Sequence, residues 1–366
     1  MPETTKKKRH IGKRLAIGFG LLVLLFMLVS LGITKIVYDK QFPRYDRADE
    51  ALSANLRYHD IEADYPRLLV SFNSTENTLQ GYLYGSEHSR ALMVIAHGLG
   101  GGADSYLSQI KHFVDAGFRV FAYDCTGSYD SEGKSTKGFP QAVLDLHAAL
   151  SYIESQPTLS SLPLLLFGHS WGGYAVVNVL NFGHDVTAVV SVSGANSAMD
   201  MVLEQGHNLM GSFIYTQYPF LWLYQHLLFG SVASSTAVSA LNKTDIPVLI
   251  IHGIEDEMVH YSGSSILAKR DRITNEKVSY ITATQEGRNA HNNLFRTDEM
   301  VQYVEKVNAQ YRLLFDAYDG EIPYETNKEF YDGIDRLQLS MLQPSLMQEI
   351  DAFLDRALTE QNAMNP

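Results

Sequence analysis

Apolar and polar positions alternate along the chain with two periods, and their order predicts a parallel sheet covered by helices. Short continuous apolar runs are typical of strands buried on both faces, whereas apolar residues recurring every three or four positions are typical of amphipathic helices. Because runs of the two kinds alternate from residue 91 onward, we expect an α/β fold with a mostly parallel sheet. We expect strands over 68–74, 78–84, 91–96, 119–124, 162–167, 186–192, 248–251 and 278–283, and helices over 104–116, 138–156 and 174–181.

Two segments interrupt this alternation and predict additions to the core fold. Residues 198–245 separate two core strands, contain seven aromatic side chains, and have no Asp, Glu, Lys or Arg between Met210 and Ser231. A connection of this length is usually functional, and we expect a helical cap above the edge of the sheet. Packing of the cap onto the core is an equally good explanation of its aromatic residues. Residues 296–366 have helical spacing and predict a C-terminal helical extension.

The N-terminal region combines a basic cluster with an uncharged apolar run. Six of the first 14 residues are Lys or Arg, and the next 19 residues, from Leu15 to Ile33, carry no charge. Such a run can cross the hydrocarbon core of a membrane, and the basic cluster predicts a cytoplasmic N-terminus. A cleaved signal peptide is the alternative, but no A-x-A-like cleavage site ends the run. We therefore expect a basic cytoplasmic leader over 1–14, a single transmembrane anchor of the cell membrane over 15–38, and a catalytic domain outside the cytoplasm.

Composition limits the number of domains and the classes of partner. The chain has 366 residues, 45% of them hydrophobic, which suffices for one large domain. After a juxtamembrane connector over 39–65, we expect this domain over 66–366, with the cap and the extension inside it. The net charge of −12 argues against nucleic acid, because phosphate binding needs a basic face. The single cysteine, Cys125, excludes an internal disulfide. Oligomeric state does not follow from the sequence.

The stretch Gly168–Gly173 is a G-x-S-x-G pattern between an apolar strand and a helix. This context is typical of the nucleophile elbow, in which a strained turn projects a serine hydroxyl above the sheet edge. We therefore predict that Ser170 is a catalytic nucleophile. An ordinary Gly-rich turn is the alternative. His169 is expected to point away from the elbow.

A serine nucleophile needs a general base, and His291 is the strongest candidate. It follows the last predicted strand in a polar, Gly-containing loop that can return over the sheet edge. A histidine in a surface loop is the alternative interpretation of His291. If His291 is not the base, His260 and the cap histidines His207 and His226 are the other candidates.

The acid that orients the base is expected between Ser170 and His291 in the chain. Asp256 lies at the carboxyl end of the strand near 248–251, where active sites of α/β folds assemble. Glu255 and Glu257 are its possible substitutes.

Acyl transfer also requires N–H donors for the developing oxyanion. We expect the backbone N–H of Trp171, directly after the nucleophile, to be one donor. The loop His97–Gly102 follows the first core strand and is rich in glycine. It should provide the second donor, the N–H of Leu99, with Gly100 as the alternative.

Taken together, these motifs resemble the α/β-hydrolase superfamily, in particular its serine-aminopeptidase-like and monoglyceride-lipase-like branch. The resemblance covers about residues 68–295 and implies the α/β-hydrolase fold and the triad above. It rests on His97-Gly98, Tyr123-Asp124…Gly127…Ser131-Glu132-Gly133, Gly168–Gly173, His252-Gly253 with Asp256 and Val259, and His291.

We expect a serine hydrolase of carboxylesterase or lipase type that acts on a small-molecule ester with an uncharged apolar acyl group. We expect no cofactor and no metal ion. A serine aminopeptidase is one alternative, and it would need an acidic group to hold the substrate ammonium. Asp200 and Glu204, near the start of the cap, are the candidates for that role. A non-catalytic membrane-anchored interaction module is an alternative from another class.

Overall fold

A sheet of eight strands forms the centre of the computed structural model, which describes residues 3–364 and the side chains of residues 13–363. The strand order is β1-β2-β4-β3-β5-β6-β7-β8. β1 and β2 pair antiparallel with their neighbours, and every pair from β4 to β8 is parallel, which confirms the predicted sheet. The bounds are Arg67–Ser74 (β1), Asn77–Tyr84 (β2), Leu92–Ala96 (β3), Arg119–Tyr123 (β4), Leu164–His169 (β5), Ala188–Val192 (β6), Val248–Gly253 (β7) and Val278–Ala283 (β8).

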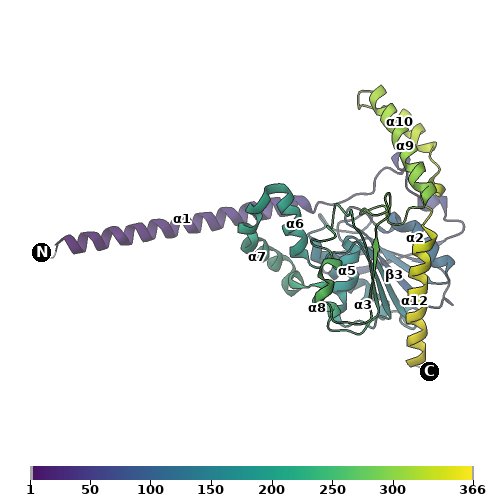
Figure 1. Cartoon of the computed structure of the whole chain (residues 1–366), viewed down its shortest axis with the longest axis horizontal. Helices are drawn as coiled ribbons and strands as arrows, with labels where there is room; N and C mark the ends of the chain where they lie inside the picture. Colours follow the sequence, from purple (N-terminus) through teal and green to yellow (C-terminus); the bar gives the residue numbers. More distant parts are fainter. Residues whose placement is uncertain (1–2, 365–366) are drawn as a thin grey trace.

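Helices cover both faces of this sheet (Figure 1). Successive residues of a strand point to opposite faces, so Val94 and Ile95 of β3 belong to two different hydrophobic clusters. α3, α5 and α8 pack on the Val94 side, and α2 and α12 pack on the Ile95 side. The bounds of the helices in the core are Leu107–Asp115 (α2), Phe139–Glu154 (α3), Pro157–Ser160 (α4), Trp171–Asn178 (α5), Ala237–Leu241 (α8) and Pro344–Met364 (α12).

Two of the predicted helices begin elsewhere in the structure. The helix predicted over 174–181 begins at Trp171, directly after Ser170. The low helix propensity of Gly172 and Gly173 hid this start, because tertiary packing at the strand–helix junction overrides propensity. The helix predicted over 104–116 begins with a turn of 3-10 helix before α2.

The N-terminal segment forms one continuous helix, α1 (Glu3–Gln41), which includes the first residues of the predicted connector. Its part from Lys13 to Gln41 is long and apolar enough to cross a membrane, with a mean hydropathy of 2.6 in its most apolar window. Of the predicted leader, residues 1 and 2 lie outside the described residues. The rest of the connector lies on the α/β domain, where the N–H of Tyr45 donates to the carbonyl of Gly127 at 2.9 Å. It contains short 3-10 turns at Glu50–Leu52 and Tyr58–Asp60.

The two segments that interrupt the alternation are helical. The segment 198–245 contains α6 (Ala198–Met210), α7 (Tyr218–Phe229) and α8, and α6 and α7 lie beside the C-terminal half of α1 (Figure 1). After β8, α9 (Asp298–Ala317) and α10 (Tyr324–Asp332) project from the body (Figure 1). The short α11 (Arg336–Leu339) then leads to α12, which returns to the sheet and buries Ile350 and Leu354 completely.

Candidate active site

Ser170 occupies a strained turn between β5 and α5. Its φ of 57° and ψ of −115° are rare for a residue with a side chain and cost about 1–3 kcal/mol, so they persist only where the surroundings impose them. Here the surroundings are a strand and a helix in near contact. A Cβ atom at Gly172 would lie 1.9 Å from the carbonyl oxygen of Ala96, and one at Gly168 would lie 2.2 Å from that of Gly172. The glycines of the motif are therefore needed for close packing.

The structure brings Ser170, His291 and Asp256 into one hydrogen-bonded chain. The Nε2 atom of His291 lies 2.8 Å from Ser170 Oγ, and its Nδ1 atom lies 2.8 Å from both carboxylate oxygens of Asp256. The donors and acceptors are all satisfied if Nδ1–H donates to Asp256 and Nε2 accepts from the serine hydroxyl. Asp256 follows β7 and His291 follows β8, so both loops meet at the carboxyl edge of the sheet. In this arrangement His291 can remove the hydroxyl proton of Ser170.

The Asp256 carboxylate is fixed by several donors. The backbone N–H groups of Met258 and Val259 donate to its Oδ1 at 3.0 and 2.8 Å, and the Nε2 atom of His252 lies 3.2 Å from its Oδ2. Burial works to raise the pKa of Asp256, but the hydrogen bonds from His252 and His291 outweigh it and hold this pKa well below the ordinary value. The carboxylate therefore stays ionised and can stabilise an imidazolium at His291.

The other candidate acids and bases are not part of the hydrogen-bonded chain. The Glu257 carboxylate accepts from the backbone N–H of His291 at 3.2 Å, so it positions the loop and not the ring. The side chain of Glu255 forms no hydrogen bond or ion pair within the described part of the chain. His260 lies 3.5 Å from the carboxylate of Glu204. The cap histidines contact aromatic rings of the cap: His226 stacks on Trp222, and His207 lies tilted against Tyr215.

The expectation that His169 points away from the elbow is wrong. Its Nδ1 atom lies 2.9 Å from the hydroxyl of Tyr106, and its Nε2–H donates to the carbonyl of His291 at 2.9 Å. Since β5 ends at His169 and the chain then turns through positive φ at Ser170, the ring is directed between these two loops. Burial lowers the pKa of His169 to about 4, which keeps the ring neutral near pH 7. Sequence reasoning missed the contact of this ring with the His291 loop.

The loop after β3 lies beside Ser170, as an oxyanion loop requires. A Cβ atom at Gly98 would lie 3.4 Å from the Cβ of Ser170, and Leu99 and Gly100 also line the cavity around the serine. His97 shapes the loop, because its Nδ1–H donates to the carbonyl of Gly98 at 2.7 Å and its Nε2 accepts from the N–H of Cys125 at 2.9 Å. Burial lowers the pKa of His97 to about 4, consistent with this neutral form.

The other predicted donor is the N–H of Trp171, the first residue of α5. N–H groups in the first turn of a helix have no partner within the helix. The oxyanion role of Leu99 and Trp171 stays a prediction, and their positions are compatible with it.

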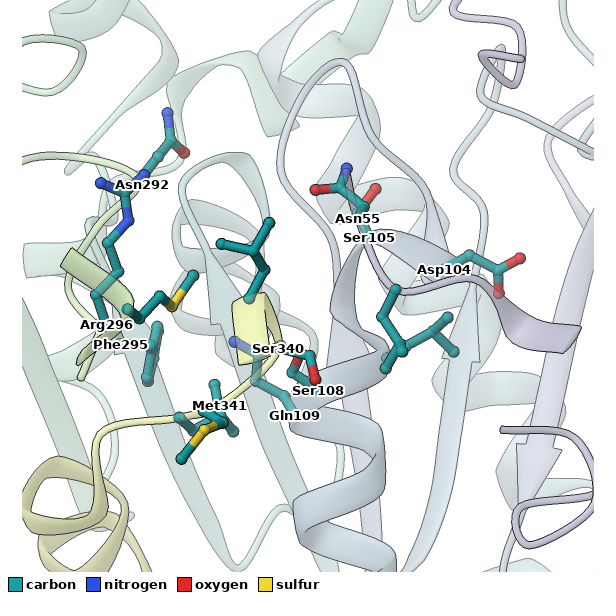
Figure 2. Close-up of a pocket in the computed structure, with 15 residues that line it drawn as sticks. Asn55, Asp104, Ser105, Ser108, Gln109, Asn292, Phe295, Arg296, Ser340 and Met341 are labelled. Atoms are coloured by element: carbon teal, nitrogen blue, oxygen red, sulfur yellow. The ribbon is translucent and has the colours of Figure 1, made fainter. Parts of the chain in front are cut away.

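Ser170 and His291 line a cavity of about 1100 Å³. Half of the remaining lining residues come from the cap and from α1, and most of these are apolar; the described lining contains no Asp or Glu. Its one charged side chain is Arg296, which also lines a smaller neighbouring pocket of about 210 Å³ (Figure 2). Figure 2 shows Arg296 and Asn292 on one side of that pocket and Asn55 and Ser105 on the other.

Arg296 has no carboxylate within ion-pairing distance among the described side chains, and its Nε is buried without a hydrogen-bond partner. Burial accordingly lowers its pKa. An isolated arginine has no sequence pattern, so sequence reasoning could not identify it. Among the described residues, no group of three or more His, Cys, Asp or Glu is placed to hold a metal ion.

Comparison with known proteins agrees with this fold. The family model described as serine aminopeptidase, S33, matches residues 87–241. The structure of a Pyrococcus furiosus esterase, Pf2001, superposes with a TM-score of 0.51 at 17% sequence identity and covers 74% of this chain and 94% of that one. At this identity the likeness concerns the fold alone.

Two curated proteins are similar in sequence over part of their length. The quorum-quenching protein AidA of Acinetobacter baumannii is 29% identical over 146 residues, which are 36% of this chain and 46% of that protein. The uncharacterized protein YfhR of Escherichia coli K12 is 27% identical over 213 residues, which are 54% of this chain and 66% of that protein. The chain thus matches about half to two thirds of the length of these relatives. It is an α/β-hydrolase in fold, and it is similar to the serine aminopeptidase family over residues 87–241.

Proposed function

We propose that this protein is a serine hydrolase that cleaves carboxylic esters through an acyl-enzyme intermediate. The observation that carries the proposal is the continuous chain of hydrogen bonds from Ser170 through His291 to Asp256 at the wall of a large apolar cavity. Positioned groups of this kind supply the nucleophile, the base and the stabilisation of the imidazolium.

The reaction has two halves. His291 Nε2 accepts the hydroxyl proton while Ser170 Oγ attacks the ester carbonyl, and the N–H groups of Leu99 and Trp171 stabilise the oxyanion. The tetrahedral intermediate expels the alcohol, which takes the proton from His291, and the acyl group stays on Ser170. Water then gives a proton to His291 and attacks the acyl-enzyme, which releases the carboxylic acid and restores the serine.

The cavity wall supports an apolar acyl group in preference to a free amino terminus. An aminopeptidase needs a carboxylate that faces the substrate ammonium, and the two candidates are occupied elsewhere. Asp200 accepts from the side-chain amide of Asn196 at 2.6 Å, and Glu204 accepts from the hydroxyl of Ser264 at 2.6 Å. Neither acid lines the cavity.

A substrate panel tests this preference. Short- and medium-chain acyl esters, a monoacylglycerol and aminoacyl-arylamides should be compared on the full chain, with Ser170→Ala as the blank. We expect kcat/KM to be highest for the esters. A higher kcat/KM for the arylamides would replace the esterase proposal by the peptidase one. Absence of turnover on every substrate, together with absence of labelling by a fluorophosphonate probe, would favour the interaction module.

We further propose that α1 remains attached as a single-span anchor, with its N-terminus in the cytoplasm and the hydrolase domain outside. The length and hydropathy of Lys13–Gln41 and the basic residues that precede it support this proposal. Mass spectrometry of the mature protein should find Leu15–Ile33, and protease added to intact cells should cut beyond residue 41. A mature chain that begins near residue 35–40, or protection of the domain from protease, would contradict it.

A further inference from the structure

The cavity that contains Ser170 is bounded along one side by the anchor helix itself. The α1 residues in its wall recur at helical spacing on one face and include Phe26, Ser30, Ile33, Thr34, Val37 and Gln41. The small polar side chains of this face, Ser30 and Thr34, are only 4% and 5% exposed, although most of the helix is exposed. At 1.5 Å per residue, the lining face from Phe26 to Gln41 is about 22 Å long. A helix that only attached the domain to a membrane would not need to line the cavity.

The cap contacts α1 well inside its apolar run. The rings of Phe26 and Phe220 meet edge to face with centroids 5.9 Å apart, and those of Tyr38 and Tyr224 do so at 5.4 Å. Phe26 lies about 10 Å along the helix from Ile33, the last residue of the uncharged run, whereas half of a hydrocarbon core is about 15 Å thick. If α1 spans a membrane, its contact with Phe220 therefore holds this edge of the cap at the depth of the acyl chains.

The outer surface of the cap suits that depth. Tyr215, Leu227 and Leu228 do not line the cavity and are 58%, 72% and 41% exposed, and no Asp, Glu, Lys or Arg occurs from 210 to 231. Soluble proteins rarely expose a continuous apolar patch of this kind. Trp222 is also exposed on α7, and tryptophan is enriched where proteins cross the boundary between lipid and water.

We infer that α1 and the cap form one membrane-immersed unit, and that the acyl chain of the substrate reaches Ser170 from the outer leaflet along the lining face of α1. The substrate class is then a long-chain acyl ester that partitions into the bilayer. This inference rests on the proposed esterase function and on the proposed topology. The occupant of the exposed cap surface is lipid, because the patch is uncharged and continuous with the surface of the spanning helix.

Fluorescence quenching tests the immersion of the cap independently of catalysis. The chain has two tryptophans, of which Trp171 is fully buried and Trp222 is 44% exposed on α7. In phosphatidylcholine vesicles with brominated acyl chains, we expect the tryptophan emission of the wild type to be quenched. In Trp222→Phe, we expect this quenching to disappear. Equal emission in brominated and ordinary vesicles would overturn the inference. So would crosslinking of two copies through the cap, which would show that a second chain covers the patch.

The role of α1 as a wall is tested by paired substitutions on opposite faces of the helix. Ile33→Trp fills the lining face, and Leu28→Trp places the same bulk on the face that does not line the cavity. For the full chain in vesicles, we expect Ile33→Trp to lower kcat/KM about tenfold for a long-chain ester in the bilayer and to lower it less for p-nitrophenyl acetate, whose acyl group has only two carbons. Leu28→Trp should change neither.

Equal effects of the two substitutions on the long-chain ester would contradict the inference. If Ile33→Trp lost activity on both esters, the quenching experiment would decide, since it needs no turnover. If the wild type cleaved neither ester, the proposed function itself would fail, and quenching would still report whether the cap lies in the bilayer.

Discussion

The two ends of the cavity are held by different kinds of interaction. At the Ser170 end, His291 and Asp256 are buried, directional hydrogen bonds fix the side chains, and the backbone of the serine is strained. At the α1 and cap end, the contacts are apolar and non-directional, and Phe213 and Leu209 are largely exposed. Fixed geometry is needed where charge develops during the reaction, whereas an apolar chain only needs room and surface. Substitutions should therefore cost far more at the first end than at the second.

The largest effect is expected for His291→Ala. Loss of the base leaves Ser170 without an acceptor for its proton, and kcat should fall on the order of 10⁵–10⁶-fold, as in triads whose members act as a unit. The comparison change at the other end, Phe213→Ala, should lower kcat/KM by less than about tenfold, because it removes only apolar contact area. Steady-state kinetics on a medium-chain ester measure both. Retained activity in His291→Ala would point to another base. A loss in Phe213→Ala as large as that in His291→Ala would contradict the proposed difference between the two ends of the cavity.

Asp256→Asn should have the next largest effect. The amide keeps the shape of the carboxylate but no longer fixes the His291 tautomer or stabilises the imidazolium, so kcat should fall about 10⁴-fold. Glu257→Gln is the matched control, since its carboxylate accepts only from the backbone N–H of His291 and the loss should be about tenfold or less. A greater loss in Glu257→Gln than in Asp256→Asn would show that the acid is assigned to the wrong residue.

His169→Phe should have an intermediate effect, because His169 positions the His291 loop without touching the reacting atoms. The change leaves the carbonyl of His291 and the hydroxyl of Tyr106 without this partner, and we expect kcat to fall about 10–100-fold. His169→Gln, which retains an N–H donor, should recover part of the loss. If His169→Phe and His169→Gln both had the same activity as the wild type, the hydrogen bond from His169 to His291 would have no role in positioning.

The same residue gives the smallest expected effect, a change in the pH dependence of stability. The pKa of His169 is about 4 in the folded protein, below the value of about 6.5 expected in the unfolded chain. The unfolded chain therefore takes up a proton as the pH falls below 6.5 while the folded protein does not. The contribution of His169 to the free energy of unfolding is complete above pH 6.5 and is lost as the pH falls towards 4.

Denaturation of wild type and His169→Gln between pH 4.5 and 7 measures this contribution. The wild type should lose up to about 1.4 kcal/mol more per pH unit than the variant. The other buried groups are present in both proteins and cancel in the difference. Parallel curves would contradict the buried neutral state of His169.

The sequence was informative where the signal is local. The buried strands are continuous apolar runs, and Ser170, Asp256 and His291 each lie in the turn or loop that follows such a run, so their meeting at one sheet edge could be predicted. The spacing of the glycines around Ser170 likewise predicted that the strand and the helix approach closely there. These features depend on residue type at fixed spacing along the chain.

What sequence reasoning missed depends on contacts between distant segments. The orientation of His169 is set by Tyr106 and by the His291 loop, and Arg296 is isolated because no described carboxylate lies within ion-pairing distance of it. The approach of Phe220 to Phe26 joins residues almost 200 positions apart. An uncharged aromatic cap following an anchor helix could have suggested that contact, but the same composition also fits packing on the core.

Labelling of the full chain with a fluorophosphonate probe tests the central claim most directly, because the probe reacts only with an activated serine. The account predicts one covalent adduct per chain in the wild type, mapped by mass spectrometry to the peptide that contains Ser170, and no adduct in Ser170→Ala. An adduct that persists in Ser170→Ala, or that maps to another residue in the wild type, would contradict the assignment of Ser170 as the nucleophile.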